Sequence, residues 1–303
     1  GLEQYREGVE TSATPARAEV RLAELVAALS LGVDLGFGQP MEHVLRQCLI
    51  ALRLAEVLNL DDNERVVVYY TALLITVGCH SDAHEQAKWF GDDFKLKATK
   101  YTHGTSGPRG AVKMVSMLGA GNAPLHRFRV GLEFAISGHR DLNDMVNHHA
   151  DLARMLAEQL GLSNDVQQSV GASYEQWDGK GWPGTLRGEE VPLAARLAAV
   201  AEFTEVAHRV GGVDAATAIA LKRSGKHFDP SIVAALCDAP HQVFAGLDAA
   251  RTWDAVIAAE PALGVRLSGD QFETALREVA DSIDRRSPSF LGLAPAVGDP
   301  VGD

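Results

Sequence analysis

Residues 175–183 have the sequence Glu-Gln-Trp-Asp-Gly-Lys-Gly-Trp-Pro, a loop-forming stretch that is rich in glycine and tryptophan and ends in proline. A polar segment at 186–192 follows, and then the alanine-rich sequence Ala-Arg-Leu-Ala-Ala-Val-Ala at 195–201. Further on, residues 225–230 have the sequence Gly-Lys-His-Phe-Asp-Pro. Small alanine side chains let helices approach closely. These three stretches, in this order, therefore predict a closely packed helix at Leu193–Val210 with a turn segment before it and another after it.

Helical periodicity recurs outside this region, whereas strand signals are almost absent, so we expect an all-α protein. In residues 40–58, apolar side chains such as Val44, Cys48 and Ala55 recur at spacings of three and four. The expected helices are Arg21–Leu31, Pro40–Leu58, Val66–Val77, His84–Phe90, Arg109–Leu118, Leu125–Ile136, Leu142–Leu160, Asn164–Trp177, Leu193–Val210, Val213–Arg223, Pro230–Cys237 and Gln271–Arg286.

Specific residues mark several helix ends. The glycine-rich segment 32–39 is expected to end the first helix, and Pro40 suits the first turn of the next. Asp61 and Glu64 have the three-residue spacing of a capping box, which predicts a helix start just before the apolar run that begins at Val66.

Composition limits the possible functions. The chain has 303 residues, of which 46% are hydrophobic and 22% charged, and its net charge is -12. The negative charge argues against direct nucleic-acid contact, and no apolar run is long enough to span a bilayer. Three widely spaced cysteines and the absence of a signal-peptide pattern favour a reducing cytoplasm. The start at Gly1 suggests a piece of a longer protein.

The two turn segments resemble a known family. Residues 175–183 are similar to the stretch after which the HD-GYP phosphodiesterases are named, with Trp182 in place of the motif's tyrosine, and residues 225–230 resemble the sequence that closes that domain. The resemblance implies an HD-GYP-like helical bundle. It also implies an activity, hydrolysis of cyclic di-GMP by a hydroxide bound to two or three metal ions.

The family's first ligands can be placed by spacing. His43 precedes Ile75 by thirty-two residues, the spacing expected between the family's first histidine ligand and its His-Asp dyad. The dyad positions then hold Ile75 and Thr76, neither of which is a useful ligand for a hard dication.

Later ligand positions are only partly kept. Where the family has paired histidines, this chain has Ser173 and Tyr174, while His149 and Glu202 stay possible ligands. We therefore predict a small-ligand pocket in place of the metal centre, formed by His43, Ile75, Thr76, His149, Ser173, Tyr174 and Glu202.

A second candidate site follows the dyad positions. Cys79, His80 and His84, with Asp82 and Glu85, offer side chains that bind zinc, and cysteine or histidine also binds haem iron. The ordinary alternative is that Cys79 is a small buried residue and that the histidines lie at a helix end.

We divide the chain into an N-terminal helical segment at 1–39, an HD-GYP-like domain at 40–237, a connector at 238–270, and a helix and tail at 271–303. The last segment faintly resembles the start of a second HD-GYP-like unit. The arrangement is similar to that of actinobacterial regulators that carry a LuxR-like helix-turn-helix.

The leading hypothesis is a catalytically inactive sensory or regulatory domain. We expect it to bind a small ligand or cofactor, to form a homodimer and to signal to a C-terminal effector, as part of a transcriptional regulator. The alternatives are a metal-dependent phosphohydrolase with a reduced metal site, and a haem or metal sensor that uses the 79–84 cluster. We expect no direct nucleic-acid contact by this segment and no membrane contact.

Overall fold

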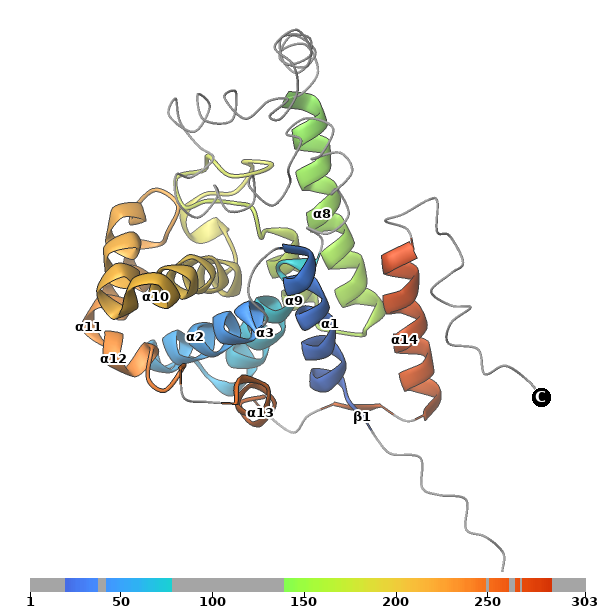
Figure 1. Ribbon diagram of the computed structural model, residues 1–303. Coiled ribbons are helices and arrows are strands. Elements are labelled where there is room, and N and C mark those ends of the chain that lie inside the picture. Colours follow the sequence, from blue (N-terminus) through green and yellow to red (C-terminus); the bar gives the residue numbers. More distant parts are fainter. Residues whose placement is uncertain are drawn as a thin grey trace, which may run out of the picture.

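Helices form almost all of the regular structure in the computed structural model, which describes residues 20–37, 42–77, 139–248, 251–261, 265–267 and 269–284 (Figure 1). The all-α fold expected from the sequence is therefore confirmed. The elements are β1 (Val20–Arg21), α1 (Leu22–Phe37), α2 (His43–Val57), α3 (Asp62–Leu74), α8 (His139–Gln159), α9 (Asn164–Gly171), the 3-10 helix η3 (Gly188–Glu190), α10 (Leu193–Arg223), α11 (Pro230–Asp238), α12 (Pro240–Val243), α13 (Thr252–Ala258), β2 (Arg266–Leu267) and α14 (Gly269–Asp284).

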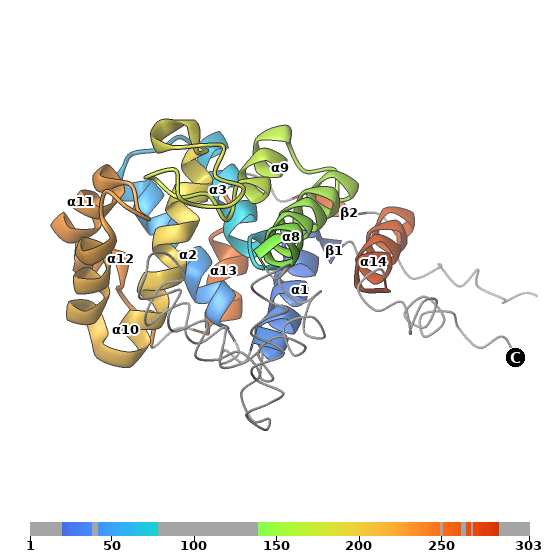
Figure 2. The same ribbon diagram turned by 90° about the horizontal axis from the view of Figure 1, so that it is seen from above.

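Helices α2, α3 and α10 form the centre of the bundle, and the other helices surround them (Figures 1 and 2). α2 and α3 are consecutive helices joined by a short turn, and Cys48 Sγ lies 3.7 Å from the carbonyl oxygen of Tyr69 where they meet. α1 packs on this pair, and the Ser30 hydroxyl donates a 2.9 Å hydrogen bond to the carbonyl of Leu73. Fully buried side chains, among them Leu45, Ile50, Leu73 and Leu197, fill the space between these helices.

The capping box predicted before α3 is present. Asp61 is the N-cap residue; its side chain accepts a hydrogen bond from the Glu64 amide, and the Glu64 side chain accepts one from the Asp61 amide, both at 2.9 Å. Two amides at the helix start, which have no partner within the helix, are thereby paired.

Two predicted helix ends were wrong. α1 continues through Gly32 to Phe37 instead of ending near Leu31, because packing of this helix on α2 and α3 outweighs the cost of about 1 kcal/mol for a helical glycine. α9 ends at Gly171 and does not reach Trp177, since the residues after it turn into the loop of residues 175–186.

The kink in α10 agrees with the prediction of two helices, Leu193–Val210 and Val213–Arg223. Gly211 and Gly212 have non-helical backbone angles, and Gly212 has a φ of 69°. A positive φ is easily reached only by glycine, so the two arms of α10 can fold back at this point.

The segment expected as a connector is a closely tethered part of the fold. We call residues 240–248, 251–261 and 265–267 the strap. It crosses α2 and α3 and returns to the start of α1, where β2 pairs antiparallel with β1 and Val20 lies opposite Leu267. The sequence did not predict these two-residue strands.

Helix α14 agrees with the helix predicted near Gln271–Arg286, and it lies beside α8 (Figures 1 and 2). The prediction of a second HD-GYP-like unit in 271–303 extends beyond the described residues. Among the helices that the structure describes, none is long and apolar enough to cross a bilayer.

Candidate functional site

The glycine- and tryptophan-rich loop is held together by the buried carboxylate of Glu175. Its two oxygens accept hydrogen bonds from the amides of Gly184, Thr185 and Leu186 at 2.9–3.2 Å, and from the Thr185 hydroxyl at 3.1 Å. Gly181 packs so closely that a Cβ atom there would lie 2.4 Å from the carbonyl oxygen of Tyr174. These contacts give the loop one fixed shape.

The loop is also joined to the closing segment at 225–230. The amide of Trp177 donates to the His227 carbonyl at 3.2 Å, and the amide of Asp178 donates to the Lys226 carbonyl at 2.8 Å. Arg196, on α10, forms an ion pair with Asp229, which caps α11. The two segments that carry the family resemblance are therefore in direct contact.

The proposed dyad positions follow the last turn of α3. Ile75 is 5% exposed and Thr76 is 4% exposed. The Thr76 hydroxyl has no hydrogen-bond partner among the described residues. A hydrocarbon and a single neutral hydroxyl offer no anionic ligand to a metal ion.

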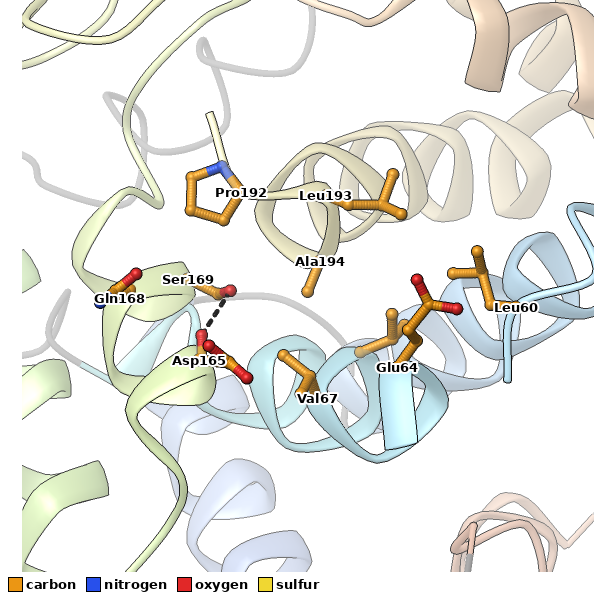
Figure 3. A pocket seen from close by; sticks show the side chains of 10 residues that line it. Leu60, Glu64, Val67, Asp165, Gln168, Ser169, Pro192, Leu193 and Ala194 are labelled. Carbon is orange, nitrogen blue, oxygen red and sulfur yellow. Dashed lines mark hydrogen bonds between the residues drawn. The ribbon is translucent and has the colours of Figure 1, made fainter. Parts of the chain in front are cut away.

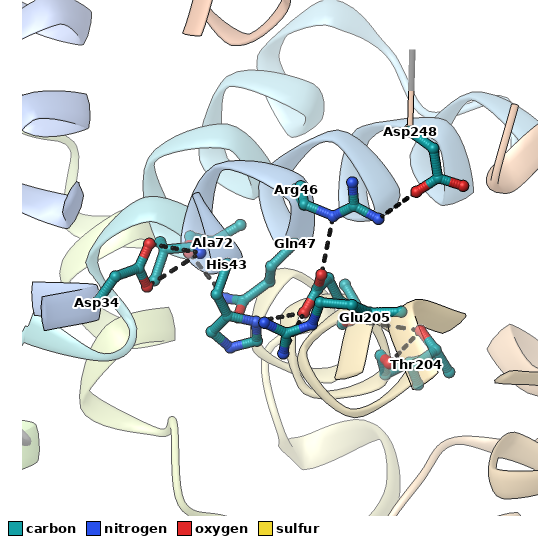
Figure 4. Close-up of polar contacts among 12 residues, drawn as sticks. Asp34, His43, Arg46, Gln47, Ala72, Thr204, Glu205 and Asp248 are labelled. Atoms are coloured by element: carbon teal, nitrogen blue, oxygen red, sulfur yellow. Dashed lines mark hydrogen bonds and ion pairs between the residues drawn. The ribbon is translucent and has the colours of Figure 1, made fainter. Parts of the chain in front are cut away.

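His43 opens α2 and is buried against α10 (Figure 4). Its Nδ1 lies 2.5 Å from Oε2 of Glu205. Arg46 donates to Oε1 of Glu205 at 2.9 Å, and Arg209 lies 3.4 Å from Oε2. Burial alone would raise the pKa of Glu205, but the hydrogen bond from His43 and the charges of His43, Arg209 and Arg46 together lower it. Glu205 is thus an ionised carboxylate surrounded by cationic groups.

Asp34, near the end of α1, is a second buried carboxylate at the same end of α2 (Figure 4). It accepts a hydrogen bond from the Val44 amide at 3.3 Å. Burial raises its pKa to about 6, although His43 and the Val44 amide act in the opposite direction.

The remaining predicted residues lie on other elements. His149 is a buried residue of α8, and its Nδ1 lies 3.4 Å from the hydroxyl of Tyr174, which follows α9. The Ser173 hydroxyl is buried without a hydrogen-bond partner among the described residues. Glu202 is buried on α10; burial lowers the pKa of Arg223 to about 10, while the charge of Glu202 acts to raise it.

The structure brings two of the residues predicted for the ligand pocket into contact. That all seven form one pocket stays a prediction. His149 and Tyr174 are in contact, whereas the contact found for His43 is with Glu205. Within the described part of the chain, no three His, Cys, Asp or Glu side chains are placed to hold a metal ion. Cys79, His80 and His84 lie outside the described residues.

A surface pocket of about 230 Å³ lies between α3, α9 and the start of α10 (Figure 3). Val67 and Ala194 contribute apolar surface, and Glu64 and Asp165 contribute carboxylates. None of the seven residues predicted for the ligand pocket lines it.

Sequence reasoning missed Glu205, Arg46 and Asp34. Glu205 lies one turn after Glu202, so the helical spacing of three residues was a signal that both carboxylates share a side of α10. Arg46 lies one turn after His43 in the same way. No short-range pattern marks Asp34, because its partner amide comes from the next helix.

Comparisons with known proteins agree with this architecture. The family described as HD domain matches residues 138–232. The chain is 28% identical over 213 residues to a 3'3'-cGAMP-specific phosphodiesterase of Vibrio cholerae, a match that covers 70% of this chain and 46% of that protein. A cyclic di-GMP phosphodiesterase of the same organism is 43% identical over 68 residues, which are 20% of this chain and 14% of that protein.

A solved structure is also similar. The crystal structure of a cyclic GMP-AMP-specific phosphodiesterase of V. cholerae, V-cGAP3, superposes with a TM-score of 0.69 at 25% identity, covering 91% of this chain and 63% of that one. The chain spans less than half of the length of the curated relatives described above. Residues 138–232 thus match the HD domain family, and the chain is similar to cyclic-dinucleotide phosphodiesterases in sequence and in fold.

Proposed function

We propose that this domain binds a cyclic dinucleotide, or a closely related phosphodiester, without hydrolysing it, and that binding regulates a C-terminal effector. The relatives named above act on 3'3'-cGAMP or cyclic di-GMP, which supplies the ligand class. The proposal that hydrolysis is lost is supported by Ile75 and Thr76. These two buried side chains occupy the positions where the resemblance expects the metal-binding dyad.

The chemistry of the site supports this proposal. Hydrolysis of a phosphodiester near neutral pH needs a nucleophilic hydroxide and positive charge close to the phosphate, and metal ions supply both in this family. His43 contacts Glu205, and Glu202 lies close enough to Arg223 for its charge to affect that arginine. These contacts place an arginine near each of the two carboxylates, Glu205 and Glu202.

Neutral polar groups support ligand binding. Thr76 and Ser173 place buried hydroxyls that have no hydrogen-bond partner among the described residues. Buried polar groups are usually paired, so these hydroxyls suit a ligand or ordered water that supplies the missing bonds. The Tyr174–His149 pair adds a third polar group from a different part of the fold.

A metal-dependent phosphohydrolase with a reduced metal site is the second candidate. The comparisons favour it over the first proposal, because all the named relatives are phosphodiesterases. Its ligands would be His43, His149 and Glu202, with help from Cys79–His84.

One experiment separates the two candidates. The purified protein is mixed with 3'3'-cGAMP and with cyclic di-GMP, with and without Mn²⁺, and binding is measured by calorimetry while products are followed by chromatography. The first proposal expects binding with no product and no stoichiometric metal by elemental analysis. Metal-dependent product that is lost in His149→Ala would instead support the second candidate. No binding and no product would contradict both.

Further expectations concern assembly, the effector and the alternative of a haem or metal sensor. We propose a homodimer in the cytoplasm, with an effector in a longer protein that is a regulator of transcription. A haem bound by Cys79, His80 or His84 would give a Soret band in the purified protein, and zinc there would appear in the elemental analysis. The oligomeric state can be measured by light scattering.

A further inference from the structure

The carboxylate of Glu205 connects two helices and, through Arg46, the strap (Figure 4). We call His43, Arg46, Glu205 and Arg209 the Glu205 cluster. Oε2 of Glu205 lies near His43 and Arg209, and Oε1 accepts from Arg46. Because the carboxylate is fully buried, its charge is compensated mainly by these side chains.

Arg46 extends the cluster to the strap. While its Nε binds Glu205, one terminal nitrogen donates to the Leu247 carbonyl at 2.7 Å and the other to the Asp248 carboxylate at 3.0 Å. The planar guanidinium holds these donors in a fixed relation. A movement of Glu205 or of Arg46 therefore changes the contact between these two side chains and also the contacts of Arg46 with Leu247 and Asp248.

The strap is held at this point by packing as well. Phe244 and Leu247 are buried, and the Phe244 ring stacks on His208, the residue beside Arg209 on α10, at a centroid distance of 4.7 Å. Further along, Thr252 donates to the Glu42 carboxylate at 2.9 Å, just before His43. The start of α2 and the strap are thus linked on both sides of the Glu205 cluster.

The strap leads from these contacts to the C-terminal helix. Tyr69 donates to the carbonyl of Val256 at 3.2 Å, and Tyr70 donates to the carboxylate of Glu260 at 2.8 Å. β2 then pairs with β1, and α14 begins two residues after β2 ends. The described parts of the strap therefore contact α2, α3 and β1, and β2 contacts α14.

We propose that the Glu205 cluster is a coupling device that transmits a change at His43 to the strap, and through it to α14. This inference rests on the proposed function, because it assigns the route by which occupancy of the pocket that includes His43 is communicated. A ligand that draws His43 away from Glu205 leaves the buried carboxylate to Arg46 and Arg209. Arg46 then shifts toward Glu205 and loosens its hold on Leu247 and Asp248.

The test measures the coupling without any ligand. Amide hydrogen exchange, followed by mass spectrometry, is compared in His43→Gln, Arg46→Met and wild type over peptides of residues 244–260. We expect exchange there to be about tenfold faster in both variants, because each removes a partner from a buried charged cluster. The Glu42–Thr252 hydrogen bond also joins the start of α2 to the strap, so faster exchange that reaches Leu247 and Asp248, the partners of Arg46, and not only the region of Thr252, is the result that indicates transmission through Glu205.

The matched control is Arg196→Met. Arg196 and Asp229 form an ion pair as buried as that of Arg46 and Glu205, with exposures of 15% and 1% against 13% and 0%. We expect faster exchange in 226–238 of this variant and less than about a twofold change in the strap. An equal effect in the strap would mean general destabilisation and would overturn the proposal, as would unchanged strap exchange in a folded His43→Gln protein.

A second experiment changes the strap side of the cluster and observes His43. It tests the coupling even if His43→Gln does not fold. Energetic coupling is reciprocal, so Arg46→Met and Asp248→Asn should both change the imidazole nitrogen shifts of His43 in ¹⁵N NMR, while Arg196→Met should not. Unchanged shifts in both variants would overturn the proposal. Binding of 3'3'-cGAMP is measured separately, so its failure would count against the proposed function and leave the coupling result standing.

Discussion

Replacing the buried Asp34 by asparagine should stabilise the protein at neutral and alkaline pH. Burial raises the folded-state pKa of this carboxyl to about 6, from an ordinary value of 3.8, despite the opposing effects of His43 and the Val44 amide. Asparagine has nearly the same shape and keeps a side-chain oxygen to accept from the Val44 amide. The substitution therefore removes the buried charge and preserves the hydrogen bond.

The magnitude follows from linkage between proton binding and folding. Because the folded-state pKa is the higher one, the free energy of unfolding falls as pH rises from about 3.8 to about 6 and stays lowered above that window. One pKa unit corresponds to about 1.4 kcal/mol, so ionised Asp34 destabilises the fold by at most about 3 kcal/mol at pH 8. At pH 5 the penalty is roughly half as large.

Urea unfolding of wild type and Asp34→Asn at pH 8 and pH 5 measures this difference. The variant should be more stable at both values, by up to about 3 kcal/mol at pH 8 and about 1.6 kcal/mol at pH 5. A variant that is less stable at pH 8 would refute the reasoning. A gain that does not change with pH would show that some effect other than the buried charge is responsible.

Three further substitutions probe the loop and the pocket. Gly181→Ala should lower the free energy of unfolding by about 3 kcal/mol, since its Cβ would clash with backbone atoms; a melting temperature equal to that of wild type would contradict the packing. Glu175→Gln should cost about 2 kcal/mol in urea unfolding, because an amide NH₂ would face the backbone amides that now donate to the carboxylate, and unchanged stability would show that Glu175 does not anchor the loop. Tyr174→Phe should cost about 1 kcal/mol and weaken cyclic-dinucleotide binding about threefold, measured by calorimetry; unchanged affinity would remove Tyr174 from the pocket.

Local signals in the sequence were sufficient for most of the helical framework. The capping box of Asp61 and Glu64 fixed the start of α3, because its hydrogen bonds depend only on residues three apart. The early end of α9 and the continuation of α1 through Gly32 could not be predicted in this way. Both depend on contacts with parts of the chain that lie close only after folding.

The same limit applies to the site. The position of His43 followed from its spacing to Ile75, but its partner Glu205 lies 162 residues away in sequence. The link from Arg46 to Asp248 spans 202 residues. No pattern in a single sequence states which of several buried acids will meet a given histidine, so the Glu205 cluster could be found only in the folded structure.

The contacts of the loop at 175–183 with the segment at 225–230 bear on how such proteins are detected. Trp177 and Asp178 form backbone hydrogen bonds with His227 and Lys226, so the two recognisable motifs support each other in the folded structure. Selection for stability alone would conserve both, whether or not any phosphodiester is cleaved. A search that relies on these motifs therefore detects an inherited scaffold, and the presence of hydrolysis has to be judged from residues elsewhere in the chain.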